Sequence, residues 1–332
     1  MKPETACIHA QRDSSGNTGS VTVPIYQSAT FAHPGLGQTT GYDYTRLQNP
    51  TREHVEKLLA ALEGGVDALA FSSGMAAITA IFDMFSPCDE IIATDDLYGG
   101  SIRLFSLISK RNGLFVKYVN SSDLSVLESA ITNNTKAVFI ENPTNPLMNV
   151  TDIAAVRELT ADKNILLIVD NTFLTPYFCN PLQLGADIAV HSGTKYLAGH
   201  NDTLAGFVVC KTPEYSEKLR YIQKTTGAVL SPFDSFLTTR GIKTLALRME
   251  KSQRNAIKIA AWLQKHPKVT RVFYAGLPEH PAYEISKRQG RGFGAMISFS
   301  VDCTRTVQNL LNNIQLILFA ESLGGVETLI TY

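Results

Sequence analysis

From residue 51 the chain alternates between two patterns of apolar residues. The run at 51–65 has apolar positions at helical spacing, starts with a Thr cap and ends in a Gly pair, which predicts an α-helix. Short apolar runs rich in β-branched residues then recur between helical stretches. These runs are 67–71, 89–94, 115–119, 136–141, 165–170, 187–191 and 206–210. Strands this apolar, separated by helices, predict a largely parallel sheet covered on both faces, in an α/β domain of residues 49–240.

Two further segments flank this domain. Residues 1–48 are rich in Gly, Ser, Thr and Pro and show little periodicity, so we expect an arm that lies across a neighbouring domain or subunit. Residues 241–332 contain a helical pattern at 252–266 and strand-like runs at 269–274 and 294–301. This predicts a smaller α+β domain, although about 90 residues are few for a domain with its own core.

Composition and charge limit the kinds of molecule that this protein is expected to bind. The chain has 332 residues, 44% of them hydrophobic and 18% charged, which is typical of a soluble globular protein. Thirty basic residues balance thirty acidic ones, so no overall field attracts nucleic acid or membrane. No apolar run reaches the roughly 20 residues that span a bilayer, and the N-terminal residues lack the apolar core of a secretory signal. We expect a cytoplasmic protein that binds a small molecule and copies of itself.

The cysteines and histidines predict no metal site. The five cysteines are scattered, odd in number and never spaced as C-x-x-C, which favours reduced thiols. The seven histidines show no spacing such as H-E-x-x-H.

Polar residues follow three of the predicted strands. Gly74, in the run FSSGMAAITA, opens a helix whose free N–H groups and dipole favour an anion. Asp170 ends the most apolar strand, where a carboxylate must be paired or hydrogen-bonded. Lys195 follows a strand in HSGTKY, and desolvation would lower its pKa and make it a nucleophile. The ordinary alternatives are a tight turn, a helix cap and a solvated surface lysine.

Taken together, the three positions predict one cofactor. Ligands of open α/β sheets bind at the carboxyl ends of the strands, where all three residues would lie. Pyridoxal phosphate requires an anion site for its phosphate, a carboxylate for its ring nitrogen and a lysine for its aldehyde. The carboxylate keeps the ring protonated, so the ring can accept electrons.

A different class of enzyme shares part of this pattern. Ser192 and Lys195 form an S-x-x-K tetrad, the nucleophile pattern of penicillin-binding proteins and β-lactamases. Those enzymes also need S-D-N and K-T-G runs, and neither occurs here. The cofactor interpretation is therefore preferred over a serine hydrolase.

Beyond these positions the chain resembles the Cys/Met-metabolism, or transsulfuration, group of pyridoxal-phosphate enzymes. That group includes cystathionine γ-lyase, γ-synthase and β-lyase, and methionine γ-lyase. The matching runs lie in unbroken order from about residue 20 to the end: YTRLQNPT, SSGMAA, DDLYGG, ENPTNPL, VDNTF, HSGTKYLAGHND, GIKTLALRME and AESLGG. The resemblance implies a fold of the aspartate-aminotransferase type (fold type I) and a homotetramer built as a dimer of dimers.

The resemblance also implies a role for each matching residue. Lys195 would bond to the cofactor aldehyde and shuttle protons, Asp170 would hold the pyridinium nitrogen, and Tyr98 would stack on the ring. Asn145 would sit beside the phenolic oxygen. The cofactor phosphate would be bound by Gly74, Met75, Ser192 and Thr194, and by Tyr44 and Arg46 from the arm of the neighbouring subunit.

The same resemblance narrows the reaction. Gly100 stands where methionine γ-lyase has a characteristic Cys, which speaks against that activity. Arg103 and Glu321 match residues of γ-lyases and γ-synthases, and the arginine would meet the distal end of cystathionine. Ser322, next to Glu321, is expected to contact the substrate as well. The ordinary alternatives are a surface arginine and a helix-end carboxylate. We predict a carbon–sulfur lyase that cleaves cystathionine by γ-elimination and also cleaves the carbon–sulfur bond of cysteine. The alternatives are a β-lyase, a γ-synthase or an inactive cofactor-binding protein.

One run of the family is missing from the printed sequence. In the family, ESLGGVE is followed by a stretch containing RLSVG, whose arginine grips the substrate α-carboxylate. The printed sequence ends at Tyr332, before that stretch. A protein without this arginine is expected to hold the cofactor yet bind amino acids poorly.

Overall fold

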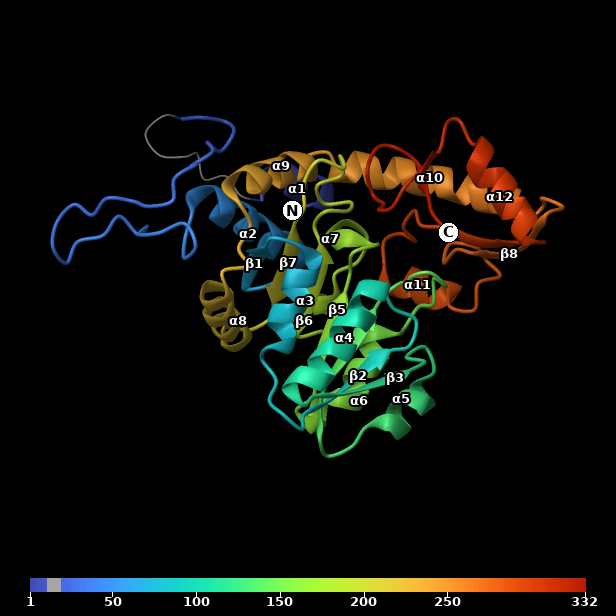
Figure 1. The fold of residues 1–332 in the computed structure, drawn as a ribbon, viewed down its shortest axis with the longest axis horizontal. Helices are drawn as coiled ribbons and strands as arrows, with labels where there is room; N and C mark the ends of the chain where they lie inside the picture. The colour runs from blue at the N-terminus through green and yellow to red at the C-terminus, as the bar shows by residue number, and fades with distance from the viewer. Residues whose placement is uncertain (11–18) are drawn as a thin grey trace.

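A seven-stranded sheet forms the centre of the computed structural model, which describes residues 1–10 and 19–332 (Figure 1). The strands are β1 (Asp67–Phe71), β2 (Glu90–Thr94), β3 (Phe115–Val119), β4 (Thr135–Glu141), β5 (Leu166–Asp170), β6 (Ile188–Ser192) and β7 (Gly206–Cys210). Their order across the sheet is β1-β7-β6-β5-β4-β2-β3, and β7 runs antiparallel to both neighbours while the other pairs are parallel. The predicted, largely parallel α/β sheet is confirmed.

Helices cover both faces of this sheet because its strands are apolar on both. Alternate residues of β5 show the division: Ile168 packs with the helices of one face, and Leu167 and Val169 pack with those of the other. The first face carries α3 (Gly74–Phe82), α4 (Gly99–Asn112) and α8 (Pro213–Thr226). The second carries α2 (Pro50–Glu63), α5 (Leu124–Ala130), α6 (Ile153–Thr160), α7 (Thr175–Phe178) and the start of α10 (Leu245–Leu263).

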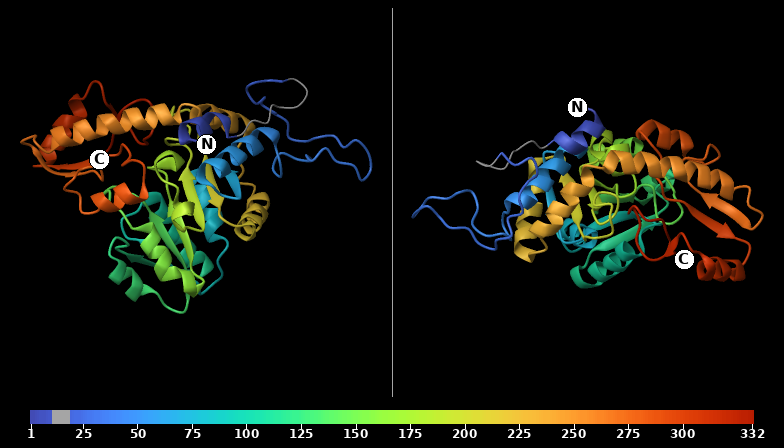
Figure 2. Two further views of the ribbon diagram at one scale, coloured as in Figure 1. Left: turned by 180° about the vertical axis from the view of Figure 1, so that it is seen from behind. Right: turned by 90° about the horizontal axis from the view of Figure 1, so that it is seen from above.

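A long helix connects the sheet domain to the C-terminal residues. After α9 (Pro232–Ile242), α10 begins at Leu245, earlier than the predicted run at 252–266, and extends beyond the sheet (Figures 1 and 2). The predicted strand-like runs form an antiparallel pair. The remaining elements are β8 (Val269–Phe273), α11 (Tyr283–Gln289), β9 (Ser298–Val301), α12 (Thr304–Asn313), β10 (Leu318–Phe319) and β11 (Leu329–Ile330). Within the described residues, no helix has the length and hydropathy to cross a membrane.

The N-terminal segment has one element that the sequence pattern did not predict. Helix α1 (Pro3–His9) contacts α2 and α10, and Cys7 is buried in the core of the large domain. Residues 11–18 of the predicted arm lie outside the described residues. Residues 19–48 form no helix or extended strand, and Figure 1 shows them reaching away from the sheet.

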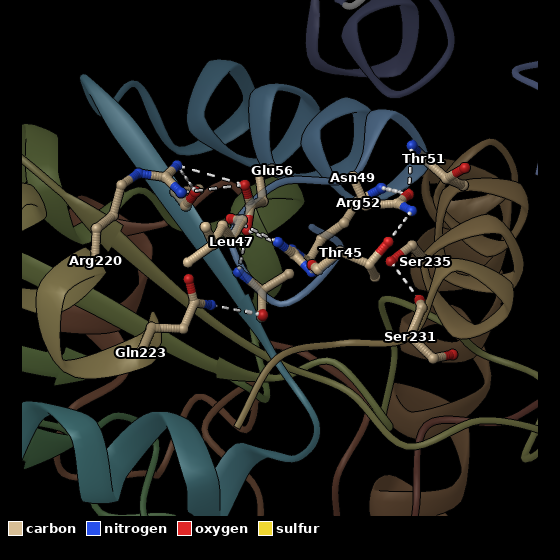
Figure 3. Close-up of polar contacts among 12 residues, drawn as sticks. Thr45, Leu47, Asn49, Thr51, Arg52, Glu56, Arg220, Gln223, Ser231 and Ser235 are labelled. Atoms are coloured by element: carbon tan, nitrogen blue, oxygen red, sulfur yellow. Dashed lines mark hydrogen bonds and ion pairs between the residues drawn. The ribbon is translucent and has the colours of Figure 1, made fainter. Parts of the chain in front are cut away.

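Arg52 fixes the base of this arm to the large domain (Figure 3). Its side chain is 2% exposed, and its guanidinium donates to the carbonyl oxygens of Thr45 at 2.7 Å and Leu47 at 2.9 Å. The guanidinium also lies 3.6 Å from the carboxylate of Glu56, which accepts the N–H of Ala70 on β1 at 2.9 Å. The arm therefore leaves the domain from a fixed point.

Replacing Arg52 by Ala should lower the free energy of unfolding by about 3 kcal/mol, because two carbonyl oxygens lose their donor and the buried Glu56 carboxylate loses a cationic neighbour. Urea denaturation measures this change. The control is Lys218→Ala, which breaks an exposed i,i+4 pair with Glu214 at 2.8 Å and should cost only about 0.3–0.5 kcal/mol. Equal losses in the two variants would show that Arg52 does not anchor the arm.

Candidate active site

The carboxyl ends of β4, β5 and β6 meet at one edge of the sheet. Glu141 pairs in register with Asp170, and Asp170 pairs with Val190 of the next strand. Ser192 ends that strand, and Lys195 follows in the turn after it. The structure thus brings together Asp170, Ser192 and Lys195, as the sequence predicts for the carboxyl edge of an α/β sheet.

Lys195 is half-buried at this edge. Its Nζ donates to the hydroxyl of Ser322 at 2.8 Å, across 127 residues of chain. Burial lowers the pKa of the Lys195 amine, and the nearby Glu321 carboxylate opposes this by raising it. Within the described residues a backbone hydrogen bond, from the N–H of Lys195 to the carbonyl oxygen of Ser192 at 3.2 Å, joins the two residues, but no hydrogen bond joins their side chains. The S-x-x-K side-chain pair of a serine hydrolase is therefore not formed.

The segment that carries Ser322 packs directly on the lysine turn. A Cβ added at Gly324 would lie 2.6 Å from the backbone nitrogen of Tyr196, so only glycine permits this approach. Both Gly324 and Ser322 have positive φ angles, of 81° and 100°, and the serine therefore holds a conformation that L-residues rarely adopt. This strained backbone holds the Ser322 hydroxyl against the Lys195 amine.

Asp170 is a partly buried carboxylate that lacks a cationic partner in the described structure. One of its oxygens accepts the N–H of Thr172 at 2.9 Å. Burial raises the pKa of Asp170, whereas hydrogen bonds from Thr172 and the charge of His191 lower it. No ion pair satisfies this carboxylate among the residues that the structure describes, so it is suited to a cationic ring nitrogen.

The start of α3 lies against Ser192 and is suited to bind an anion. The hydroxyl of Ser73 caps the helix by accepting the N–H of Ala76 at 3.1 Å. The N–H groups of Gly74 and Met75 come first in the helix and have no acceptor in the described part of the chain. A Cβ at Gly74 would lie 2.9 Å from that of Ser192, so the helix start and the serine face the same space.

Thr194 is close to this space, but its hydroxyl is already engaged. The hydroxyl accepts the N–H of Ala205 at 3.0 Å and lies 3.3 Å from the carbonyl oxygen of the same residue. Its predicted phosphate contact stays a prediction that needs a different hydroxyl orientation.

Tyr98 and Asn145 come from loops at the same edge. Tyr98 stands at the start of α4 and is 48% exposed, and its N–H donates to Glu141 Oε2 at 2.9 Å. A Cβ at Gly100 would lie 2.4 Å from Tyr98 Cε1 and 3.0 Å from the sulfur of Met75. The Tyr98 ring therefore lies across Gly100, with much of its surface free to stack on a planar ligand.

Four predicted site residues make no hydrogen bond or ion pair with this cluster in the described part of the chain, although the charge of one of them, Glu321, acts on the Lys195 amine. Tyr44 and Arg46 lie on the exposed arm, where Arg46 donates to the carbonyl oxygen of Lys224 at 2.6 Å. Arg103 is exposed on α4, and the exposed Glu321 accepts the hydroxyl of Thr331 at 2.8 Å.

Glu141 and Thr172 belong to the site, although the sequence interpretation did not select them. Glu141 ends an apolar strand just as Asp170 does, so the same pattern could have found it. Thr172 connects the ends of β5 and β6. Its backbone N–H donates to the carboxylate of Asp170, and its hydroxyl accepts the N–H of Ser192 at 2.8 Å. No sequence signal points to that bridging contact.

The residues present fit pyridoxal phosphate: a half-buried amine, an unpaired carboxylate, an anion site at a helix start and an exposed aromatic ring. Fold and site together define a pyridoxal-phosphate enzyme of fold type I. The chain belongs to the family described as Cys/Met metabolism PLP-dependent enzyme, which matches residues 4–332. Its cofactor is therefore pyridoxal 5′-phosphate.

Relatives of known activity divide among three reactions. A cystathionine gamma-lyase of Bacillus subtilis (strain 168) is 49% identical over 331 residues, covering 100% of this chain and 87% of the relative. A cystathionine beta-lyase of Coxiella burnetii (strain RSA 493 / Nine Mile phase I) is 46% identical, covering 99% and 86%. The crystal structure of a cystathionine gamma synthase from Xanthomonas oryzae pv. oryzae in complex with aminoacrylate and cysteine is 39% identical, with a TM-score of 0.97, covering 100% and 86%.

Because the Tyr98 ring lies close to Gly100, a substitution at Gly100 tests the position of the ring. Gly100→Ala should displace the ring and weaken cofactor binding about threefold to tenfold, which corresponds to the loss of one stacking contact. Gly99→Ala is the matched control, because a Cβ there meets nothing within 4 Å. Titration of the apoprotein with pyridoxal phosphate gives both dissociation constants, and equal constants would refute the proposed stacking position.

Proposed function

We propose that this enzyme is a carbon–sulfur lyase that cleaves cystathionine, and also cysteine. From cystathionine, γ-elimination gives cysteine, 2-oxobutyrate and ammonia. The observation that carries the proposal is the half-buried Lys195 amine, held by Ser322 at the edge where Asp170 stands. The 49% identity to a cystathionine gamma-lyase over the whole chain supports the choice of reaction.

Lys195 is proposed to move the protons of the reaction. When bound, pyridoxal phosphate supplies an electron sink for the carbanion at the substrate Cα. The lowered pKa of Lys195 leaves more of its amine neutral at a given pH than in a free lysine, and the neutral amine is the form that accepts a proton. After the proton on Cα has been removed, a second proton must leave Cβ before the γ-thiol departs. The Lys195 amine would move both protons.

The other residues of the edge are proposed to hold the cofactor. Asp170 would face the ring nitrogen, Tyr98 would stack on the ring, and Asn145 would lie beside the phenolic oxygen. The proposed phosphate site consists of Gly74, Met75, Ser192 and Thr194, with Tyr44 and Arg46 from a partner subunit.

Arg103 and Glu321 are proposed to recognise the distal end of cystathionine. That end carries a carboxylate and an ammonium group, for which a guanidinium and a carboxylate are the complementary partners. Both side chains are exposed, and no ion pair occupies either one in the described structure. Ser322, which follows Glu321, would lie between the distal site and the Lys195 amine.

The arm supports a shared active site. Arg52 fixes the backbone at Thr45 and Leu47, on either side of Arg46, and the arm that carries these residues reaches away from the sheet of its own protomer (Figure 1). We infer that the arm completes the phosphate site of a neighbouring subunit, in a homotetramer made of two such dimers that works in the cytoplasm.

The same residues could serve two related reactions. Elimination at Cβ needs only the first carbanion and would give pyruvate, as expected of a β-lyase. A γ-synthase would add cysteine to the intermediate instead of releasing a keto acid. The product therefore distinguishes the three reactions.

Incubation of the holoenzyme with cystathionine should release 2-oxobutyrate and cysteine, and Lys195→Ala should reduce the rate by at least about a hundredfold because the proton carrier is lost. Chromatography with mass detection identifies the keto acid. Pyruvate released together with homocysteine, as the main products, would replace the γ-lyase proposal with a β-lyase. No keto acid from a protein that holds cofactor would indicate a synthase or an inactive binder.

Co-expression of Arg46→Ala and Lys195→Ala chains, each with its own tag, tests the shared site. If the arm crosses to the partner, a hybrid dimer keeps one intact site, and the mixture should recover roughly a quarter of wild-type activity. Each variant expressed alone should have little activity. A mixture no more active than the single variants would show that the arm serves its own subunit.

A further inference from the structure

A second buried carboxyl group lies beside Asp170. Glu141 ends β4 and is 6% exposed, and it pairs in register with Asp170 on the neighbouring parallel strand. Residues two apart in a strand share a face, so Glu141 lies on the face of Phe139, and Asp170 lies on the face of Ile168. Phe139 and Ile168 belong to one core cluster, which puts the two carboxyl groups side by side on one face of the sheet.

Glu141 binds the two loops that border the site. Its Oε2 accepts the N–H of Tyr98 at 2.9 Å, at the start of α4. The backbone N–H of Asn145, in the loop that follows β4, also faces this carboxyl group and lowers its pKa. One side chain thus bonds to the backbone of the residue proposed to stack on the ring and interacts with the backbone of the residue proposed to meet the phenolic oxygen.

Glu141 is buried next to other carboxyl groups, so its own carboxyl group depends on these two N–H contacts. Burial raises the pKa of Glu141, and the neighbouring carboxylates of Asp170 and Asp96 raise it further, while the N–H groups of Tyr98 and Asn145 lower it. None of the ion pairs in the described residues includes Glu141. Backbone N–H groups are therefore its polar partners, and a buried polar group without such partners is costly.

We propose that Glu141 is a positioning residue for pyridoxal phosphate, holding Tyr98 and Asn145 at the places from which they contact the cofactor ring. The proposal rests on the cofactor roles given above for these two residues. It does not depend on which sulfur amino acid the enzyme cleaves. Glu141 itself touches no reacting atom in this account.

The variants Glu141→Gln and Glu141→Ala test whether the contacts of Glu141 position the cofactor, apart from any effect on folding. The amide of Gln keeps one acceptor oxygen but places a donor towards the second N–H, and Ala keeps neither contact. We expect cofactor affinity to fall about tenfold in Glu141→Gln and further in Glu141→Ala. The circular dichroism of the bound cofactor's visible band, which reports the ring's orientation, should change in the same order.

Glu90→Gln is the matched control. Glu90 is a buried carboxylate at the opposite end of the same sheet, where it accepts from the hydroxyl of Thr135 at 2.6 Å and pairs with Lys117 at 2.6 Å. This variant should lose stability in urea without a change in cofactor affinity or circular dichroism. It therefore shows what a purely structural loss looks like.

Wild-type affinity and dichroism in both Glu141 variants would overturn the proposal. If Glu141→Ala does not fold, Glu141→Gln decides alone, with the same two readouts. If Glu90→Gln changes affinity and dichroism as much as Glu141→Gln does, the effect is structural and the proposal fails. No substrate enters these measurements, so a failure of the cystathionine assay is separate from a failure here.

Discussion

The parallel register of β4, β5 and β6 is the constraint on which the rest of the site depends. Strands paired in parallel end at the same edge of the sheet, so Glu141, Asp170 and Ser192 arrive together although they are separated along the chain. The apolar faces of these strands resist a shift in register, because a slip by one residue would turn buried side chains towards the wrong layer. The core thereby fixes the geometry of the polar edge.

The loops at this edge are held by a few buried polar contacts. Thr172 connects the ends of β5 and β6, and Glu141 connects β4 to the start of α4. The C-terminal segment contributes Ser322 to the Lys195 amine through an approach that only Gly324 allows. The chemistry of the site therefore depends on side chains that stand in one place before any ligand binds.

Much of this arrangement could be predicted from the sequence, for a physical reason. Apolar runs bounded by polar residues define buried strands, and a carboxylate or lysine directly after such a run must lie at the sheet edge, as Asp170 and Lys195 do. The contact between Lys195 and Ser322 could not be predicted, because it depends on how a distant segment folds back. Helix α1 was missed because seven residues give too short a pattern, and packing on the large domain stabilises it.

The most direct measurement is to reduce the holoenzyme with borohydride, digest it and locate the attached cofactor by mass spectrometry. The account predicts the added mass on the peptide that contains Lys195 and on no other. Cofactor found on a different lysine, or on none, would contradict the claim that the strand ends of β5 and β6 form the catalytic centre.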